Sequence, residues 1–311
     1  MARPVVVAPR GARPDTVSPM STPTTQQQQQ LDRVLSRLPA RLRRWTERVL
    51  NSWAGRTGLG WAWSLQRIEI FDRSMAVAAQ LFTAVFPMLI LLASWFGHPE
   101  SVMTGGIGLP PEAAESLEDA LKPGASSTFG IVGTIIVVVS ATSLARTLAR
   151  SFAVVWGLPR PRSSVRSAWR WVAVVLTLVL TLVLIRRMAE VTDFLPPAQL
   201  WDLVLSLAVY TAAALFVPWL LLEGVVSARL LLPGALIFAV AMTAAKPFVD
   251  LWLPHALQTS AIRYGAIGVA FTYLAWRYVI AWVFLAAAAL GSTLVSDDGP
   301  VGRRLRGSRS A

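Results

Sequence analysis

The sequence predicts an all-α fold, a polytopic transmembrane helix bundle with six spans and both termini in the cytoplasm. The first observation behind this prediction is composition: 54% of the 311 residues are hydrophobic and 15% are charged, against roughly 25% charged residues in a typical soluble domain. The second is that several stretches stay apolar for close to the ~20 residues that a helix needs to cross ~30 Å of hydrocarbon. The third is that arginine and lysine collect on one side of these stretches.

The first 30 residues predict a disordered cytoplasmic tail. They end in the polar, low-complexity run STPTTQQQQQ, which buries too little apolar surface to order itself. The opening run MARPVVVAPRGARPD has too short an apolar stretch for a signal peptide.

Residues 31–66 predict a basic amphipathic helical region at the membrane interface. From Leu31 to Leu50, apolar residues recur at spacings of three and four, and arginines occupy much of the opposite face, which is typical of a helix with one apolar stripe. Two positions suit such a helix: the surface of the inner leaflet, or a cytoplasmic surface of the protein itself.

Residues 67–296 predict the membrane domain. Each predicted span is a helix of mostly apolar residues with at most a few charges. The six spans are Ser74–Phe96, Phe129–Ser151, Ala168–Ala189, Leu203–Gly224, Leu231–Leu253 and Tyr264–Leu294.

The orientation of the bundle follows from its basic residues, because cytoplasmic flanks of spans carry an excess of lysine and arginine. With a cytoplasmic N-terminus, 23 of the 29 lysine and arginine residues lie inside and five lie outside or near the outer surface. Only Arg277 stays within the membrane. An even number of spans then places the residues 297–311, a basic tail, in the cytoplasm as well.

The same sorting explains the net charge of +12 without a nucleic-acid partner. The expected partners are the lipid bilayer and its anionic headgroups. The chain has no cysteine, which excludes disulfides and thiolate metal sites. His98 and His255 lie far apart in the sequence, so we expect no metal, no cofactor and no enzymatic activity.

Three blocks of the sequence resemble the YihY/BrkB family of bacterial inner-membrane proteins, once mistaken for ribonuclease BN. The first, Ala76–Ser94, has a central Phe-Pro, and the second, Ser140–Arg160, ends in a Trp-Gly turn. The third pairs LLPGAL at Leu231–Leu236 with the YGAIG segment that begins Tyr264–Leu290. The resemblance covers roughly residues 60–295 and rests on the order of these blocks.

The resemblance implies a multi-pass protein of the bacterial inner membrane, in a family proposed to act in envelope lipid transport or serum resistance. Two features depart from the family pattern. The last span reads AAALGST at Ala287–Thr293, where family members usually carry an acidic Gly-Ala-Glu-Leu-Asn cluster. Arg277 matches no fixed basic position of the family.

Arg277 is the charge that the sequence leaves unexplained. It lies 13 residues into the last predicted span, near mid-membrane at 1.5 Å per residue, where an arginine costs at least ~2.5 kcal/mol and rarely faces lipid. Lys246 is a second embedded cation, for which Asp250, one turn on, is the expected partner. The candidate substrate-binding residues are Arg277, Lys246, Tyr273, Tyr210 and Gln80.

Two functions follow from these residues. In the first, Arg277 and Lys246 line a polar cavity for an anionic lipid, amphiphile or organic acid, and the protein is a transporter or translocator. In the second, Arg277 donates to carbonyls freed by prolines and to Tyr210 or Gln80, and the protein is a membrane scaffold or accessory factor in envelope assembly.

The predicted topology can be tested with reporter fusions. Fusions at residues 110, 195 and 257 should report an outer location, and fusions at residues 162, 227 and 305 a cytoplasmic one. Both expected locations follow from the distribution of basic residues between the two sides of the spans. A reversal at any of the six positions would contradict the topology.

Overall fold

The computed structural model describes residues 52–96, 128–159 and 198–296, with isolated positions at 173, 174, 177, 181 and 302. Within these ranges the chain is helical apart from short turns, which confirms the all-α class. The helices are α3 (Trp53–Arg67), α4 (Ile70–Phe96), α7 (Thr128–Val155), α9 (Ala198–Leu221) and α10 (Ala228–Ser296).

Three helical segments of the described residues are long and apolar enough to cross a membrane: Leu200–Leu221, Ala228–Gly265 and Ile267–Ser296. The last two are the arms of α10, and we call Ala228–Gly265 the first arm and Ile267–Ser296 the second arm. In addition, α4 and α7 form helices where the first two spans were predicted. Helices thus lie at the positions of five of the six predicted spans, three of them long and apolar enough to cross a membrane, and the chain is an integral membrane protein.

Several predicted features fall on residues outside the described ranges. The third span at Ala168–Ala189 is described only at the helical positions 173, 174, 177 and 181. Three further predicted regions lie wholly or mostly outside the described residues: the N-terminal tail at 1–30, most of the amphipathic region at 31–66 and the C-terminal tail at 297–311.

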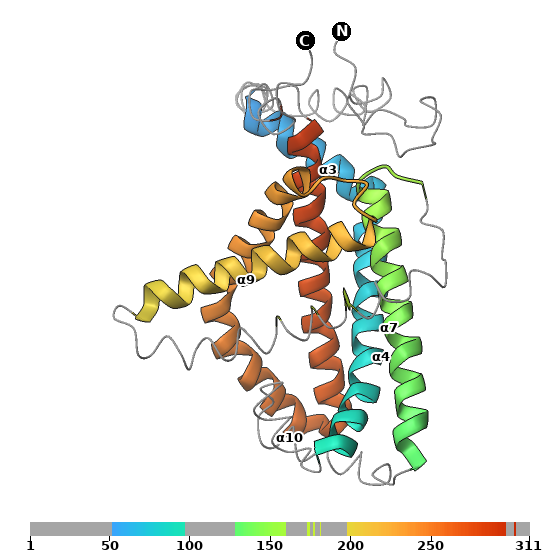
Figure 1. The fold of residues 1–311 in the computed structure, drawn as a ribbon. Helices are drawn as coiled ribbons and strands as arrows, with labels where there is room; N and C mark the ends of the chain where they lie inside the picture. Colours follow the sequence, from blue (N-terminus) through green and yellow to red (C-terminus); the bar gives the residue numbers. More distant parts are fainter. Residues whose placement is uncertain are drawn as a thin grey trace, which may run out of the picture.

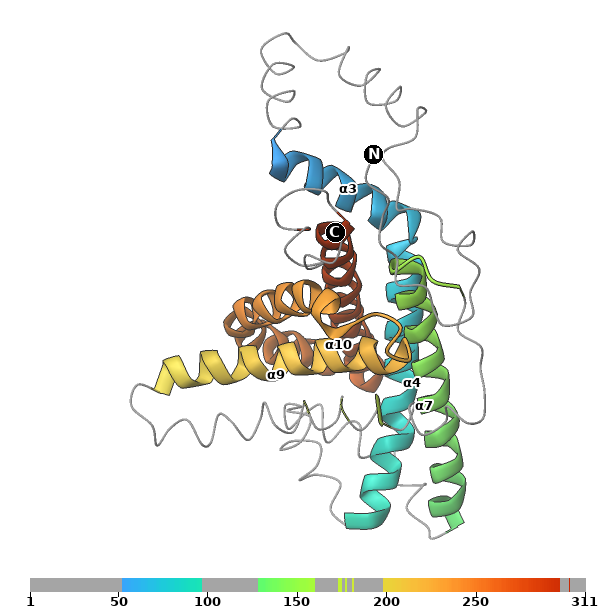
Figure 2. The same cartoon turned by 45° about the horizontal axis from the view of Figure 1, so that its top comes forward.

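The helices form a bundle with one oblique member. In Figure 1, α4, α7 and the second arm of α10 run alongside one another, whereas α9 crosses them at a wide angle. Figure 2 shows the same relation from above, with α4 and α7 side by side. The first arm of α10 leaves the bundle, bows outward and returns to the second arm at Gly265.

The turn at Gly265 corrects one predicted boundary. Residues 254–263 were expected as an outer loop, but they continue the first arm as helix. The chain reverses at Gly265, whose backbone has φ 61° and ψ −149°, a conformation essentially restricted to glycine. The hydroxyls of Ser260, before the turn, and Thr272, after it, form a hydrogen bond of 2.7 Å that connects the two arms.

The arms also meet at their other ends, where glycines remove the side chains between them. A Cβ atom on Gly291 would lie 2.5 Å from the backbone nitrogen of Gly234, and one on Gly234 would lie 3.1 Å from the carbonyl oxygen of Ala287. Close backbone approach at small residues is a common way for membrane helices to pack. The first arm therefore contacts the second at both ends and bows in between.

Four aromatic rings connect the helices through the core. Phe284 of the second arm packs edge-on against Phe152 of α7 with ring centroids 5.1 Å apart. It also packs against Phe238 of the first arm at 4.9 Å, and Phe238 meets Tyr210 of α9 at 6.3 Å. Because such ring pairs add to the burial of apolar area, this chain of rings holds α7, α9 and both arms in one core.

Helix α3 packs on the end of this core. The indole nitrogen Nε1 of Trp61 donates to the carbonyl oxygen of Ala286 at 2.9 Å. At the corner between α3 and α4, Ile68 and Ile70 are buried on either side of Glu69, which has a positive φ of 52°. Arg73 Nε donates to the Ile68 carbonyl oxygen at 2.6 Å, so the corner is fixed rather than a free joint.

Replacing Gly291 by alanine should destabilise the protein. The added methyl group would overlap the Gly234 backbone, and overpacking of this kind costs about 1–3 kcal/mol. We expect a lower midpoint of thermal unfolding in detergent for Gly291→Ala. Gly58→Ala is the control, because a Cβ atom there meets nothing within 4 Å, and an equal midpoint in both variants would argue against the close crossing.

Replacing Gly265 by alanine should also lower the midpoint of unfolding. The cost is backbone strain of about 1–3 kcal/mol, because a Cβ atom at this position meets nothing within 4 Å. Thermal unfolding beside the Gly58→Ala control measures it. An unchanged midpoint would mean that the arms are not joined by this turn.

Candidate functional site

The two embedded cations of the sequence lie in different surroundings. Lys246, in the first arm, forms an ion pair with Asp202 of α9. Its Nζ atom lies 2.7 Å from Oδ1 and 2.6 Å from Oδ2 of the carboxylate. The prediction that Asp250 pairs with Lys246 is therefore wrong. Lys246 pairs with a residue of another helix, not with one of its own helix.

The Lys246–Asp202 pair stays within reach of molecules outside the protein. Its side chains are 23% and 32% exposed. Around it, Leu203 and Val204 of α9 and Phe248 and Leu251 of the first arm are exposed apolar residues. The pair is electrically neutral as a unit, so Lys246 is not a free positive charge for an anionic ligand.

Arg277, in the second arm, has a different environment. Its Nη2 atom donates to the hydroxyl of Tyr273, one turn earlier on the same helix. The guanidinium carbon also lies 4.5 Å from the centre of the Tyr273 ring, a cation–π contact. Both contacts stabilise the charge, but neither neutralises it.

Part of the guanidinium is left without a partner. The Nε atom of Arg277 is buried and has no hydrogen-bond acceptor, and the structure gives Arg277 no carboxylate partner among the described residues. A buried donor without an acceptor costs about 1–3 kcal/mol, and more when it is charged. Arg277 is therefore the uncompensated cation of the described core.

The remaining predicted site residues spread over two other helices. Tyr210 of α9 packs against Phe238 and a small apolar cluster to which Trp276 and Ile280 of the second arm also belong. Gln80 lies partly buried on α4. The structure thus brings Tyr273 to Arg277 and Asp202 to Lys246, whereas Tyr210 packs against the apolar cluster around Phe238.

Sequence reasoning missed three polar residues near Lys246. Asp202 was placed in a loop, just before the predicted fourth span, although α9 begins at Ala198. Ser206 and Thr243 have buried hydroxyls without partners. The signal for Asp202 and Ser206 is spacing, because these two residues and Tyr210 recur every four residues along one face of α9. Thr243 lies three residues before Lys246 on the first arm.

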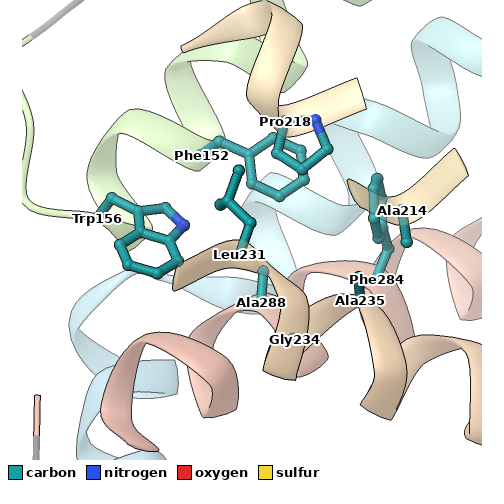
Figure 3. A pocket seen from close by; sticks show the side chains of 9 residues that line it. All are labelled: Phe152, Trp156, Ala214, Pro218, Leu231, Gly234, Ala235, Phe284 and Ala288. Carbon is teal, nitrogen blue, oxygen red and sulfur yellow. The ribbon is translucent and has the colours of Figure 1, made fainter. Parts of the chain in front are cut away.

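A small pocket lies elsewhere, at the junction of α7, α9 and the two arms. It leaves a cavity of about 10 Å³, close to the smallest volume that holds one water molecule. Figure 3 shows its lining, with Trp156 and Phe284 on opposite sides and Phe152 and Leu231 between them. The lining residues are Phe152, Trp156, Ala214, Pro218, Leu231, Gly234, Ala235, Phe284 and Ala288. This lining is apolar and uncharged, so the pocket does not suit a charged ligand.

Comparison with known proteins shows what the chain is similar to. A family model described as virulence factor BrkB matches residues 63–306. The chain is 27% identical over 233 residues to UPF0761 membrane proteins of Pseudomonas paraeruginosa and Pseudomonas aeruginosa. The match covers 70% of this chain and 56% of each relative, so the chain spans little more than half the length of these curated relatives. No solved structure matches it.

The Lys246–Asp202 pair can be tested with a double-mutant cycle. Asp202→Asn and Lys246→Met should each lower the midpoint of thermal unfolding, because each leaves one charge in apolar surroundings. The double variant should lose less than the sum, with a coupling energy of about 0.5–3 kcal/mol. Asp250→Asn is the matched control and should have no effect. Additive losses, or a loss in the control, would contradict the pairing.

Proposed function

Because the chain belongs to the BrkB virulence factor family of membrane proteins, we propose that it translocates an anionic lipid or another anionic amphiphile across the bacterial inner membrane. The proposal assigns no enzymatic reaction and no cofactor. The observation that supports this proposal most strongly concerns Arg277, a cation inside an apolar bundle. The Nε atom of Arg277 is buried and has no acceptor.

The proposed topology has six spans and both termini in the cytoplasm. Its support is the distribution of basic residues, since cytoplasmic flanks are enriched in them. In Figure 1, α3, the start of α4, the end of α7 and both outer ends of α10 gather at one end of the bundle. The described arginines of these segments are Arg56, Arg67, Arg73, Arg146, Arg150 and Arg229. Near the opposite end, at the Gly265 turn, lies Arg263.

An anionic ligand suits Arg277 for an energetic reason. Embedded arginines usually pair with an acid, with carbonyls or with a ligand, and mark substrate pathways. Tyr273 takes one donor of the guanidinium, which leaves Nε for a further acceptor. A phosphate or carboxylate on a lipid or amphiphile supplies that acceptor together with the missing negative charge.

A specific observation also favours the second function, a membrane scaffold that transports nothing. Arg277 interacts with Tyr273 of its own helix through a hydrogen bond and a cation–π contact. If these contacts suffice, the residue stabilises the second arm and needs no ligand. An apolar residue of similar size would then be tolerated, as replacements of embedded charges often are.

Substitutions at Arg277 distinguish the two functions. The measurement is translocation of fluorescently labelled phosphatidylglycerol in proteoliposomes, beside thermal stability in detergent. We expect Arg277→Lys to keep part of the activity, because it keeps the charge but loses the planar geometry. Arg277→Ala and Arg277→Leu should lower the rate at least about tenfold, the effect of losing one charge-assisted hydrogen bond.

Arg263→Ala is the matched control, since Arg263 is an exposed arginine of the same long helix. Its translocation rate should equal that of the unmodified protein. Full activity of a folded Arg277→Leu variant would overturn the anionic site and favour the scaffold.

A further inference from the structure

The seam between α9 and the first arm of α10 gathers four polar groups in an apolar region. Two are the paired Lys246 and Asp202. The other two are the hydroxyls of Ser206 and Thr243, on residues that are only 1% and 9% exposed. Ser206 lies one helical turn from Asp202, and Thr243 one turn from Lys246, so each hydroxyl shares a helix face with a member of the ion pair.

Both hydroxyls are buried and have no hydrogen-bond partner, a condition they share with the hydroxyls of Ser74 and Thr211 among the described residues. Elsewhere in the described helices, Thr83 and Thr147 donate to the carbonyl four residues earlier, the common solution for hydroxyls in membrane helices. Ser206 and Thr243 keep their donors free. A buried hydroxyl without a partner costs about 1–3 kcal/mol. A ligand acceptor that forms a hydrogen bond with either hydroxyl would remove that cost.

Proline adds an acceptor at the same place. Pro247 has no N–H group, which leaves the carbonyl oxygen of Thr243 without its usual helical donor. The first arm carries Pro247 within its helix, directly after Lys246. The seam therefore contains free donors and a free acceptor beside a positive and a negative side chain.

The surroundings of the seam suit the acyl chains of a lipid. Phe248 and Leu251 are 65% and 80% exposed, and Leu203 on α9 is 50% exposed. In an integral membrane protein such side chains face hydrocarbon. The partly exposed ion pair thus opens toward the bilayer, where no water stabilises it, and a polar headgroup that reaches it replaces the missing solvation.

We propose that this seam binds the headgroup of a phospholipid that carries both a phosphate and a primary ammonium group, as phosphatidylethanolamine does. The phosphate lies at Lys246 with the hydroxyls of Ser206 and Thr243 as donors, and the ammonium lies at Asp202 with the Thr243 carbonyl as a second acceptor. The site goes beyond the translocation proposed above, because it does not include Arg277 and exists whether or not the protein moves lipid.

The neutral pair explains why the ligand is a zwitterion. A purely anionic headgroup gains at Lys246 but is repelled at Asp202, at nearly the same distance. A headgroup with both charges gains at both residues. A choline headgroup is zwitterionic too, but its quaternary ammonium has no N–H to donate to a carboxylate. At this seam the order of affinity should therefore be phosphatidylethanolamine first, with phosphatidylcholine and phosphatidylglycerol well behind.

The test is lipid binding to the full chain in detergent, titrated with each of the three phospholipids and followed by native mass spectrometry. For phosphatidylethanolamine, we expect the double variant Asp202→Asn, Lys246→Met to bind about tenfold more weakly, the change that losing one charge-assisted contact produces. Arg263→Gln, remote from the seam in sequence and exposed, should bind as the unmodified protein does.

A second double variant, Ser206→Ala with Thr243→Val, keeps the ion pair and should also weaken binding of phosphatidylethanolamine. Because this second variant keeps the ion pair, it still tests the proposed site if the first double variant does not fold. Equal binding of the three phospholipids by Arg277→Leu, which lacks the other proposed lipid site, or unchanged binding in Ser206→Ala, Thr243→Val, would overturn the site. Arg277→Leu should leave this binding unchanged, which separates failure here from failure of the proposed translocation.

Discussion

The close contact of the α10 backbones at Gly234 and Gly291 is the constraint on which the rest of the structure depends. It lets the two arms touch without side chains between them. The contact places the rings of Phe238 and Phe284 against each other at an interplanar angle of 50°, and through them α9 and α7 join the bundle. Because the arms are also joined at Gly265, the first arm bows outward between its two ends. This bow places Lys246 beside α9.

Within this frame the protein treats its embedded charges in two ways. Lys246 receives a carboxylate from α9, so its charge is cancelled and contributes to helix packing. Arg277 receives only a phenol and an aromatic face from its own helix, so its charge remains. This contrast is why the site for a purely anionic ligand is proposed at Arg277, and the site for a headgroup with both charges at the Lys246–Asp202 pair.

Much of the fold was predictable from hydropathy and spacing, because a membrane helix satisfies its own backbone. Five of the predicted spans lie on observed helices, and Tyr273 was already on the predicted face of Arg277. What the sequence could not show was pairing between helices: Asp202 lay outside a predicted span, and its partnership with Lys246 arises only when α9 packs on the first arm. The helical residues 254–263 were missed since Pro254 and polar neighbours resemble a loop.

An anionic ligand can reach Arg277 only if the face of the second arm that carries this residue is hydrated and open to polar molecules. The chain has no cysteine, so single cysteines can be introduced at Ala270, on that face, and at the neighbouring Phe271, which is 67% exposed toward the bilayer. The measurement is the rate of labelling by a charged methanethiosulfonate reagent, which reacts with hydrated thiolates. If that face is hydrated, Ala270→Cys is labelled and Phe271→Cys is not. Labelling of neither, or of Phe271→Cys alone, would contradict a hydrated face at Arg277.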